Sequence, residues 1–145
     1  MPQIDFKEGV VHVDPVEGGK NRIAVHINDP TLYVPHRNWQ TSYPVDLIAD
    51  IARVKGPAWL CDEIMRDEQP SYVQRHVQFD ILSYVTAQWF EGKRVLDFGS
   101  GCGASTVVLA RMLPAGNFVG VELSDERTAI ARRRAGYYGF RNAQF

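Results

Sequence analysis

The chain has 145 residues, which is enough for one domain with a core of ordinary size. Its hydrophobic fraction of 45% and its charged fraction of 23% are typical of a soluble globular protein. Lys and Arg number 16 and Asp and Glu number 17, so the net charge is -1. This balance gives no electrostatic reason to expect a nucleic acid or an anionic membrane as partner.

The N-terminal residues MPQIDFKEGVVHV lack the basic and apolar blocks of a secretory signal. No uncharged apolar run approaches the ~18 residues that a membrane helix requires. We therefore expect a cytoplasmic protein without a membrane partner. The two cysteines, Cys61 and Cys102, and the scattered histidines have no metal-ligand spacing, so no metal site is expected.

Residues 1–44 are expected to form a β-hairpin and loop extension. Two runs rich in Val and Ile, 9–13 and 22–27, flank the turn-rich segment DPVEGGKN, which is typical of a hairpin. The segment NDPTLYVPHRNWQTSYP that follows is expected to be a loop. The aromatic residues of this loop, Tyr33, Trp39 and Tyr43, could line a substrate pocket, but we favour burial that anchors the loop to the body of the protein.

Residues 45–92 are expected to be a helical segment. Apolar residues recur at helical spacing from residue 45 to Lys55-Gly56-Pro57, a stop signal. A second helix is expected over 58–67. A third is expected to begin after Pro70 and to end near Phe90.

From Lys93 onward, strand and helix patterns alternate. RVLDF and NFVGVEL predict strands, 104–113 predicts a buried helix, and NAQF resembles the start of a third strand. Ser124 is a good N-cap for a helix that runs to about Tyr138. This alternation is typical of a parallel sheet with right-handed crossovers. We expect an α/β fold with the first two to three strands of a Rossmann-like, doubly wound parallel sheet.

The last helix contains three consecutive arginines, 132–134. Consecutive helical residues point in different directions, and basic residues suit a helix C-terminus. We therefore expect a solvated helix end here and no nucleic-acid patch.

The segment VLDFGSGCGAST places glycines at 99, 101 and 103 between a strand and a helix. Such a turn lets a ligand approach the backbone and points helix-start N–H groups at a negative ligand group. Gly99, Gly101 and Ala104 also satisfy the dinucleotide fingerprint. Asp97 argues against a dinucleotide, because its carboxylate repels a pyrophosphate and attracts a cationic ligand. Its structural alternative is to cap the following helix or to bond the turn amides.

Glu122 stands at the end of the second predicted strand. A carboxylate there offers two acceptor oxygens to the neighbouring hydroxyls of a ribose. The feature is shared by proteins that bind NAD and proteins that bind S-adenosylmethionine. The alternative is a plain surface acid at a strand end.

Residues 93–145 resemble the opening half of a class I S-adenosylmethionine-dependent methyltransferase, through D-F-G-S-G-C-G at 97–103 and V-G-V-E-L at 119–123. The resemblance implies that Asp97 lies near the methionine moiety, the glycines lie beneath the cofactor, Glu122 holds the ribose, and Leu123 lies against the adenine. The residues expected to bind S-adenosylmethionine are Asp97, Phe98, Gly99, Ser100, Gly101, Gly103, Glu122 and Leu123.

The segment from Pro70 matches the helix that precedes the first strand in this family. In related enzymes that helix borders the cofactor carboxylate or the acceptor pocket. For Tyr72, Arg75 and His76 we nevertheless favour ordinary surface or packing roles.

The resemblance implies methyl transfer from S-adenosylmethionine to a nucleophilic acceptor, with a small molecule slightly favoured. It assigns no catalytic residue, acceptor atom or oligomeric state. Domain organisation is expected as 1–44 (extension), 45–92 (helical segment) and 93–145 (start of the methyltransferase domain). The alternatives are an NAD-dependent oxidoreductase and a non-catalytic methyltransferase-like binding module.

The family fold is similar to a seven-stranded sheet in the order 3-2-1-4-5-7-6, and this chain stops as its third strand begins. From the sequence we therefore expect a truncated or incomplete chain with an exposed apolar sheet edge. We also expect the isolated chain to bind S-adenosylmethionine weakly or not at all.

Overall fold

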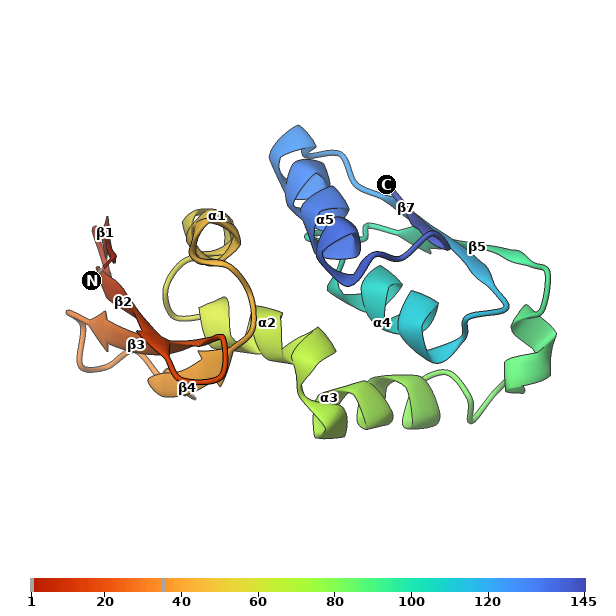
Figure 1. Cartoon of the computed structure of the whole chain (residues 1–145), viewed down its shortest axis with the longest axis horizontal. Coiled ribbons are helices and arrows are strands. Elements are labelled where there is room, and N and C mark those ends of the chain that lie inside the picture. Colours follow the sequence, from red (N-terminus) through yellow and green to blue (C-terminus); the bar gives the residue numbers. More distant parts are fainter. Residues whose placement is uncertain (1, 35) are drawn as a thin grey trace. The chain divides into compact units, whose positions relative to one another are not determined.

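The computed structural model describes residues 2–34 and 36–145. The chain divides into two compact units, Met1–Ile64 and Met65–Phe145 (Figure 1). The division falls within the segment 45–92 to which the sequence assigns helices. In the part of the chain that is described, no helix is both long enough and apolar enough to cross a membrane.

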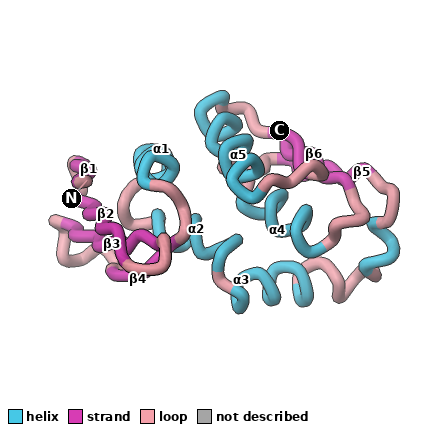
Figure 2. Tube along the Cα trace, in the orientation of Figure 1, coloured by secondary structure: helices cyan, strands magenta, loops and turns pink. Residues whose placement is uncertain are grey.

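The N-terminal unit contains a four-stranded antiparallel sheet in the order β1-β2-β3-β4 (Figure 2). The predicted hairpin is confirmed, since β2 and β3 pair along their whole length. Two further strands were not expected, and β4 lies inside the segment predicted to be a loop. The strands are β1 (Gln3–Phe6), β2 (Gly9–Val16), β3 (Lys20–Ile27) and β4 (Asn38–Thr41).

The aromatic residues of the predicted loop differ in burial. Tyr43 is fully buried, as expected of an anchor; its amide donates to Thr41 Oγ1 at 3.1 Å and its carbonyl accepts from Asn21. Trp39 is half-buried on β4. Tyr33 is 81% exposed, so the expected anchoring by this side chain is wrong.

The first two helices agree with the sequence pattern. α1 (Val45–Lys55) begins and ends as predicted, because Gly56 adopts a φ of 79° that stops it. Its apolar face, which includes Ile48 and Ile51, is buried. α2 (Leu60–Glu68) is displaced by one or two residues from the predicted range.

The single helix expected from Pro70 to near Phe90 is wrong. α3 (Pro70–Gln74) continues into a π-helical turn, η1 (Arg75–Phe79), and helical structure resumes only in the 3₁₀ turn η2 (Ala87–Phe90). The interruption, DILSYVT, is rich in β-branched residues, which lose side-chain freedom in a helix. Ser83 Oγ also donates to the Gln78 carbonyl at 3.2 Å, a local bond that competes with helix formation.

The C-terminal unit is an α/β structure built on a parallel sheet in the order β5-β6-β7, which confirms the predicted fold class. β5 and β6 pair in register, so their carboxyl ends meet at the same edge. The elements are β5 (Arg94–Phe98), α4 (Ala104–Met112), β6 (Asn117–Val121), α5 (Asp125–Tyr138) and β7 (Ala143–Gln144).

Helices α4 and α5 follow the sequence prediction, with one exception. α4 is buried on most of its surface, and Ser124 Oγ caps α5 by accepting from the Arg127 amide. Gly139 ends α5 with a φ of 70°. The expected solvated arginine triplet is wrong for Arg134, whose side chain is fully buried.

The core of the C-terminal unit lies between the sheet, α4 and the segment that precedes β5. Phe118 on β6 is fully buried and lies 6.1 Å from the ring of Phe90. On β5, Leu96 and Phe98 are exposed.

Candidate functional site

The glycine turn of residues 99–103 joins the carboxyl end of β5 to the start of α4. Gly99, Gly101 and Gly103 adopt φ values of 76°, 57° and 81°. A residue with a Cβ is strained in this left-handed region, so the backbone path of the turn explains why glycines stand at these three positions.

The backbone of the glycine turn is bonded to the end of β6. The amides of Gly99 and Ser100 both donate to the Val121 carbonyl, at 2.8 and 3.0 Å. The Gly103 amide donates to the Ser100 carbonyl at 2.9 Å, and the Gly101 amide donates to Glu122 Oε2 at 3.1 Å. Four amides of the turn therefore already have protein acceptors, and none of these four is available to a phosphate.

Glu122 holds the glycine turn and the start of α5 together. Its Oε1 accepts from the Ser124 amide at 3.0 Å while its Oε2 accepts from Gly101. The Ser124 hydrogen bond lowers the pKa of this carboxyl most; desolvation opposes the shift, and the Gly101 and Leu123 amides and the charge of Arg127 add to it. Glu122 is therefore ionised at neutral pH.

Asp97 is half-buried and ties β5 to α4. Its Oδ2 accepts a hydrogen bond of 2.6 Å from the hydroxyl of Thr106, a fully buried residue in the first turn of α4. This contact is neither the helix cap nor the bond to a turn amide that the structural alternative for Asp97 predicts. It uses one of the two carboxylate oxygens.

The remaining predicted site residues lie around the same turn. Phe98 at the end of β5 is 83% exposed, and Leu123, two residues after the end of β6, is 98% exposed. Ser100 Oγ is buried and has no hydrogen-bond partner among the described residues. The structure thus brings all eight predicted residues to one sheet edge, where two carboxylates flank the glycine turn.

Helix α5 packs directly on this turn because Gly103 has no side chain. A Cβ at Gly103 would lie 2.7 Å from the Ala131 Cβ and 2.8 Å from the ring of Phe145. A Cβ at Gly120 on β6 would lie 2.5 Å from the same ring. Both distances are shorter than carbon contacts allow, so these glycines make room for α5 and for Phe145.

A pocket of about 210 Å³ adjoins the first turn of α4. The Arg75 guanidinium lies 5.7 Å from the centroid of the Tyr72 ring, and His76 Nδ1 lies 3.3 Å from Asp80 Oδ2. Two arginines and one aspartate make the lining positive. It is formed by Arg66, Tyr72, Arg75, His76, Asp80, Ala104, Ser105 and Val108.

Sequence reasoning named part of this pocket and missed the rest. The sequence predicts ordinary roles for Tyr72, Arg75 and His76 and gives no role to Arg66 or Asp80. The spacing of four between His76 and Asp80 is the available signal, because residues so spaced face each other on a helical segment.

Residues 90–145 match a family model described as a methyltransferase domain. The arsenite methyltransferase of Aquipseudomonas alcaligenes is 33% identical over 98 residues, covering 61% of this chain and 26% of that protein. The release factor glutamine methyltransferase of Buchnera aphidicola subsp. Acyrthosiphon pisum is 39% identical over 51 residues, covering 35% and 18%. The chain therefore spans 26% and 18% of the length of these two curated relatives.

A solved structure described as StiE O-MT residues 942–1257 is similar to this chain with a TM-score of 0.43 and 18% identity. The similarity covers 68% of this chain and 42% of that one.

Replacing Gly103 by Ala is expected to destabilise the chain more than replacing Gly99 by Ala. Both residues have positive φ, which costs an L-residue about 1 to 2 kcal/mol. Only Gly103 has neighbours within contact distance of a new Cβ, which adds about 1 to 3 kcal/mol of overpacking. Urea unfolding of the two variants measures the difference, and equal losses would contradict the close packing of α5 on the turn.

The bonds of Glu122 predict a loss of stability in acid. Its pKa in the folded chain lies below the ordinary value of 4.5, so the unfolded chain takes up the proton first as the pH falls. The stabilisation is complete above that ordinary value and disappears as the pH falls through the lowered pKa. The advantage of the wild type over Glu122→Gln in unfolding free energy should therefore shrink between about pH 6 and about pH 3.

Glu126→Gln is the matched control for this titration, since Glu126 is an exposed acid in the first turn of α5. If both variants give the same pH profile, the bonds of Glu122 to the turn do not stabilise the fold.

Proposed function

We propose that this chain, whose residues 90–145 match a methyltransferase domain, takes part in the transfer of a methyl group from S-adenosylmethionine to a small acceptor. One observation carries the proposal: the glycine turn has four amides bonded to protein acceptors and two carboxylates beside it. Such a turn offers little to a phosphate. It suits a ligand with an ammonium and a sulfonium and without phosphate.

Glu122 is suited to hold a ribose although both of its oxygens already accept amide bonds. A carboxylate has about four lone-pair sites, and the amides of Gly101 and Ser124 use two of them. The others remain for the two hydroxyls of a ribose. Leu123, almost fully exposed next to Glu122, offers an apolar surface to an adenine.

Asp97 is the proposed partner of the ammonium. Its bond to Thr106 fixes the carboxylate at the end of β5, so that binding a cation there costs little further ordering. When bound, S-adenosylmethionine supplies a methyl group that its sulfonium already activates. The residues of this chain then contribute by holding and orienting the cofactor.

The pocket beside α4 is the proposed place of the cofactor carboxylate. The ammonium and the carboxylate of an amino acid are attached to the same carbon atom, so a carboxylate lies close to any ammonium held by Asp97. Asp97 is bonded to Thr106, and the neighbouring Ser105 lines the pocket. Among the described residues Arg75 has no carboxylate partner, which leaves its charge for the ligand.

The acceptor is proposed only as a small molecule. One curated relative is named for arsenite and the other for a release factor glutamine, and this chain spans a small share of either protein. An NAD-dependent oxidoreductase is the rival enzyme, and the carboxylate of Asp97 argues against it.

Titration of the ¹⁵N-labelled chain with S-adenosylmethionine and with NAD tests the cofactor, because amide shifts report weak binding as well as strong binding. We expect S-adenosylmethionine to shift the amides of the glycine turn and Leu123, and NAD at the same concentration to leave them unchanged. Asp97→Asn should lower the affinity for S-adenosylmethionine by about tenfold, because one charge-assisted hydrogen bond is lost. Asp125→Asn, an exposed acid nearby, is the control. Shifts with NAD alone would overturn the proposal.

Arg75→Ala tests the orientation of the ligand. S-adenosylhomocysteine carries the amino-acid carboxylate, whereas 5′-methylthioadenosine lacks it. We expect the variant to bind S-adenosylhomocysteine about tenfold more weakly and to bind 5′-methylthioadenosine with unchanged affinity, because only the first ligand has a carboxylate that can bond the guanidinium. Arg53→Ala in α1 serves as a control for loss of a surface charge. Equal weakening of both ligands would place the carboxylate elsewhere.

A further inference from the structure

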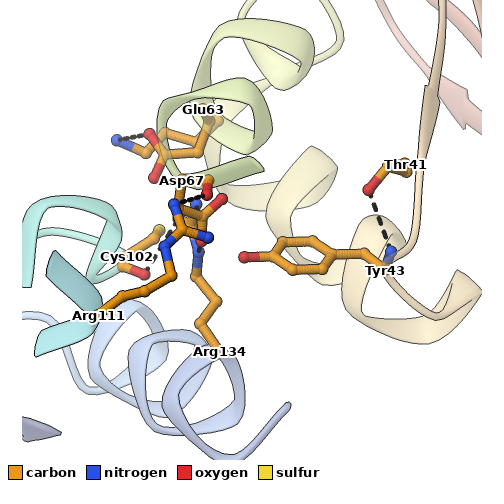
Figure 3. A network of polar contacts seen from close by, with 8 residues as sticks. Thr41, Tyr43, Glu63, Asp67, Cys102, Arg111 and Arg134 are labelled. Carbon is orange, nitrogen blue, oxygen red and sulfur yellow. Dashed lines mark hydrogen bonds and ion pairs between the residues drawn. The ribbon is translucent and has the colours of Figure 1, made fainter. Parts of the chain in front are cut away.

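Arg134 on α5 is the largest fully buried side chain in the described part of the chain. Its Nη2 lies 3.2 Å from Asp67 Oδ2, and its Nε donates to the same oxygen at 3.3 Å. Asp67, near the end of α2, is 1% exposed (Figure 3). The cationic side chain and the anionic side chain are thus buried together.

The same guanidinium also reaches the glycine turn. Arg134 Nη1 donates to the carbonyl of Cys102 at 3.3 Å, as Figure 3 shows. Cys102 stands between Gly101 and Gly103, so one planar side chain joins the carboxylate of Asp67 to the backbone of the turn. Only arginine has donors in a fork wide enough for both contacts.

This contact fixes an entire peptide unit. The Cys102 carbonyl and the Gly103 amide belong to one planar peptide group and point in opposite directions. Arg134 holds the carbonyl, and the Ser100 carbonyl accepts from the amide at 2.9 Å. Rotation of this peptide group would break both bonds at once.

Asp67 is itself held from a second side. Arg111 on α4 donates from Nη2 to the Asp67 carbonyl, and its guanidinium lies 5.7 Å from the centroid of the Tyr138 ring on α5. Asp67 is therefore bonded to α4 through its backbone carbonyl and to α5 through its carboxylate.

Stability alone does not account for such a pair. Well-packed apolar residues often replace a buried ion pair without loss of stability, because removing two charges from water is costly. An apolar side chain, however, cannot donate to the Cys102 carbonyl.

We propose that Arg134 is a positioning residue: oriented by Asp67, it fixes the Cys102–Gly103 peptide group and so the shape of the turn that binds the cofactor. The link to cofactor binding rests on the proposed function. The effect on the turn does not, and it can be measured without ligand.

The test compares Arg134→Lys with Arg132→Lys, the same substitution at an exposed site whose side chain also bonds a backbone carbonyl. A lysine ammonium keeps the charge beside Asp67 but lacks the fork that reaches Cys102 as well. We expect amide exchange at Gly103 to accelerate at least tenfold in Arg134→Lys, while exchange at Val119 in β6 stays unchanged. The affinity for S-adenosylmethionine should fall by a similar factor.

A merely structural role would give a different pattern, because exchange would then accelerate at Gly103 and Val119 together. That result, or unchanged exchange at Gly103, would overturn the proposal. If Arg134→Lys does not fold, the double variant Arg134→Gln, Asp67→Asn replaces it in the test. This variant removes both buried charges and keeps an amide donor near Cys102.

We expect amide exchange at Gly103 in the double variant to be as slow as in the wild type. Fast exchange confined to Gly103 would overturn the role of the donor.

Failure of the two proposals can be told apart. If the wild type shows no shifts with S-adenosylmethionine but Gly103 exchange depends on Arg134, the cofactor assignment fails and the positioning of the turn stands. If the wild type binds and Arg134→Lys binds equally well, the positioning role fails.

Discussion

The bonding of the glycine turn to the end of β6 is the constraint on which the candidate site depends. The Val121 carbonyl accepts from two successive amides of the turn, and Glu122, the next residue, accepts from a third. These bonds require β5 and β6 to lie side by side in register, as parallel pairing places them. Pairing of the two strands therefore determines the conformation of the turn. The turn then determines where α4 begins and how closely α5 can pack.

The electrostatic character of the site follows from the same arrangement. Two carboxylates lie at the sheet edge, and a positively charged pocket lies beside the first turn of α4. A zwitterion finds a partner of opposite sign for each of its charged groups in such a site. This separation of charge supports the proposed assignment of a sulfonium amino acid over a dinucleotide.

Sequence patterns predicted the segment from β5 to β7 well because its signals are local. Ser124 and Gly139 bound α5, the glycine spacing marks the turn, and the family match over 90–145 agrees with the motifs that suggested it. Periodicity failed where local competition decided: the stripe of apolar residues after Pro70 predicted one helix, but the segment from 80 to 86 breaks it.

The contacts of individual side chains could not be predicted from local patterns. Arg134 bonds a residue 67 positions away, and nothing in an arginine triplet shows which of the three turns inward. The strand β4 was missed for a related reason, because its pairing with β3 outweighs the loop-like composition around it. The amide partners of Glu122 likewise appear only when the sheet edge is assembled.

The acceptor for the Gly101 amide has a consequence for biosynthesis. Glu122 follows Gly101 by 21 positions, and the acceptor of Gly99 and Ser100 lies at the end of β6, so the hydrogen bonding of the turn can form only after β6 has been synthesised. Until then the segment contains three glycines, which have wide conformational freedom, and it lacks the acceptors that fix its conformation. Formation of the glycine turn therefore depends on the synthesis of β6 and on its pairing with β5.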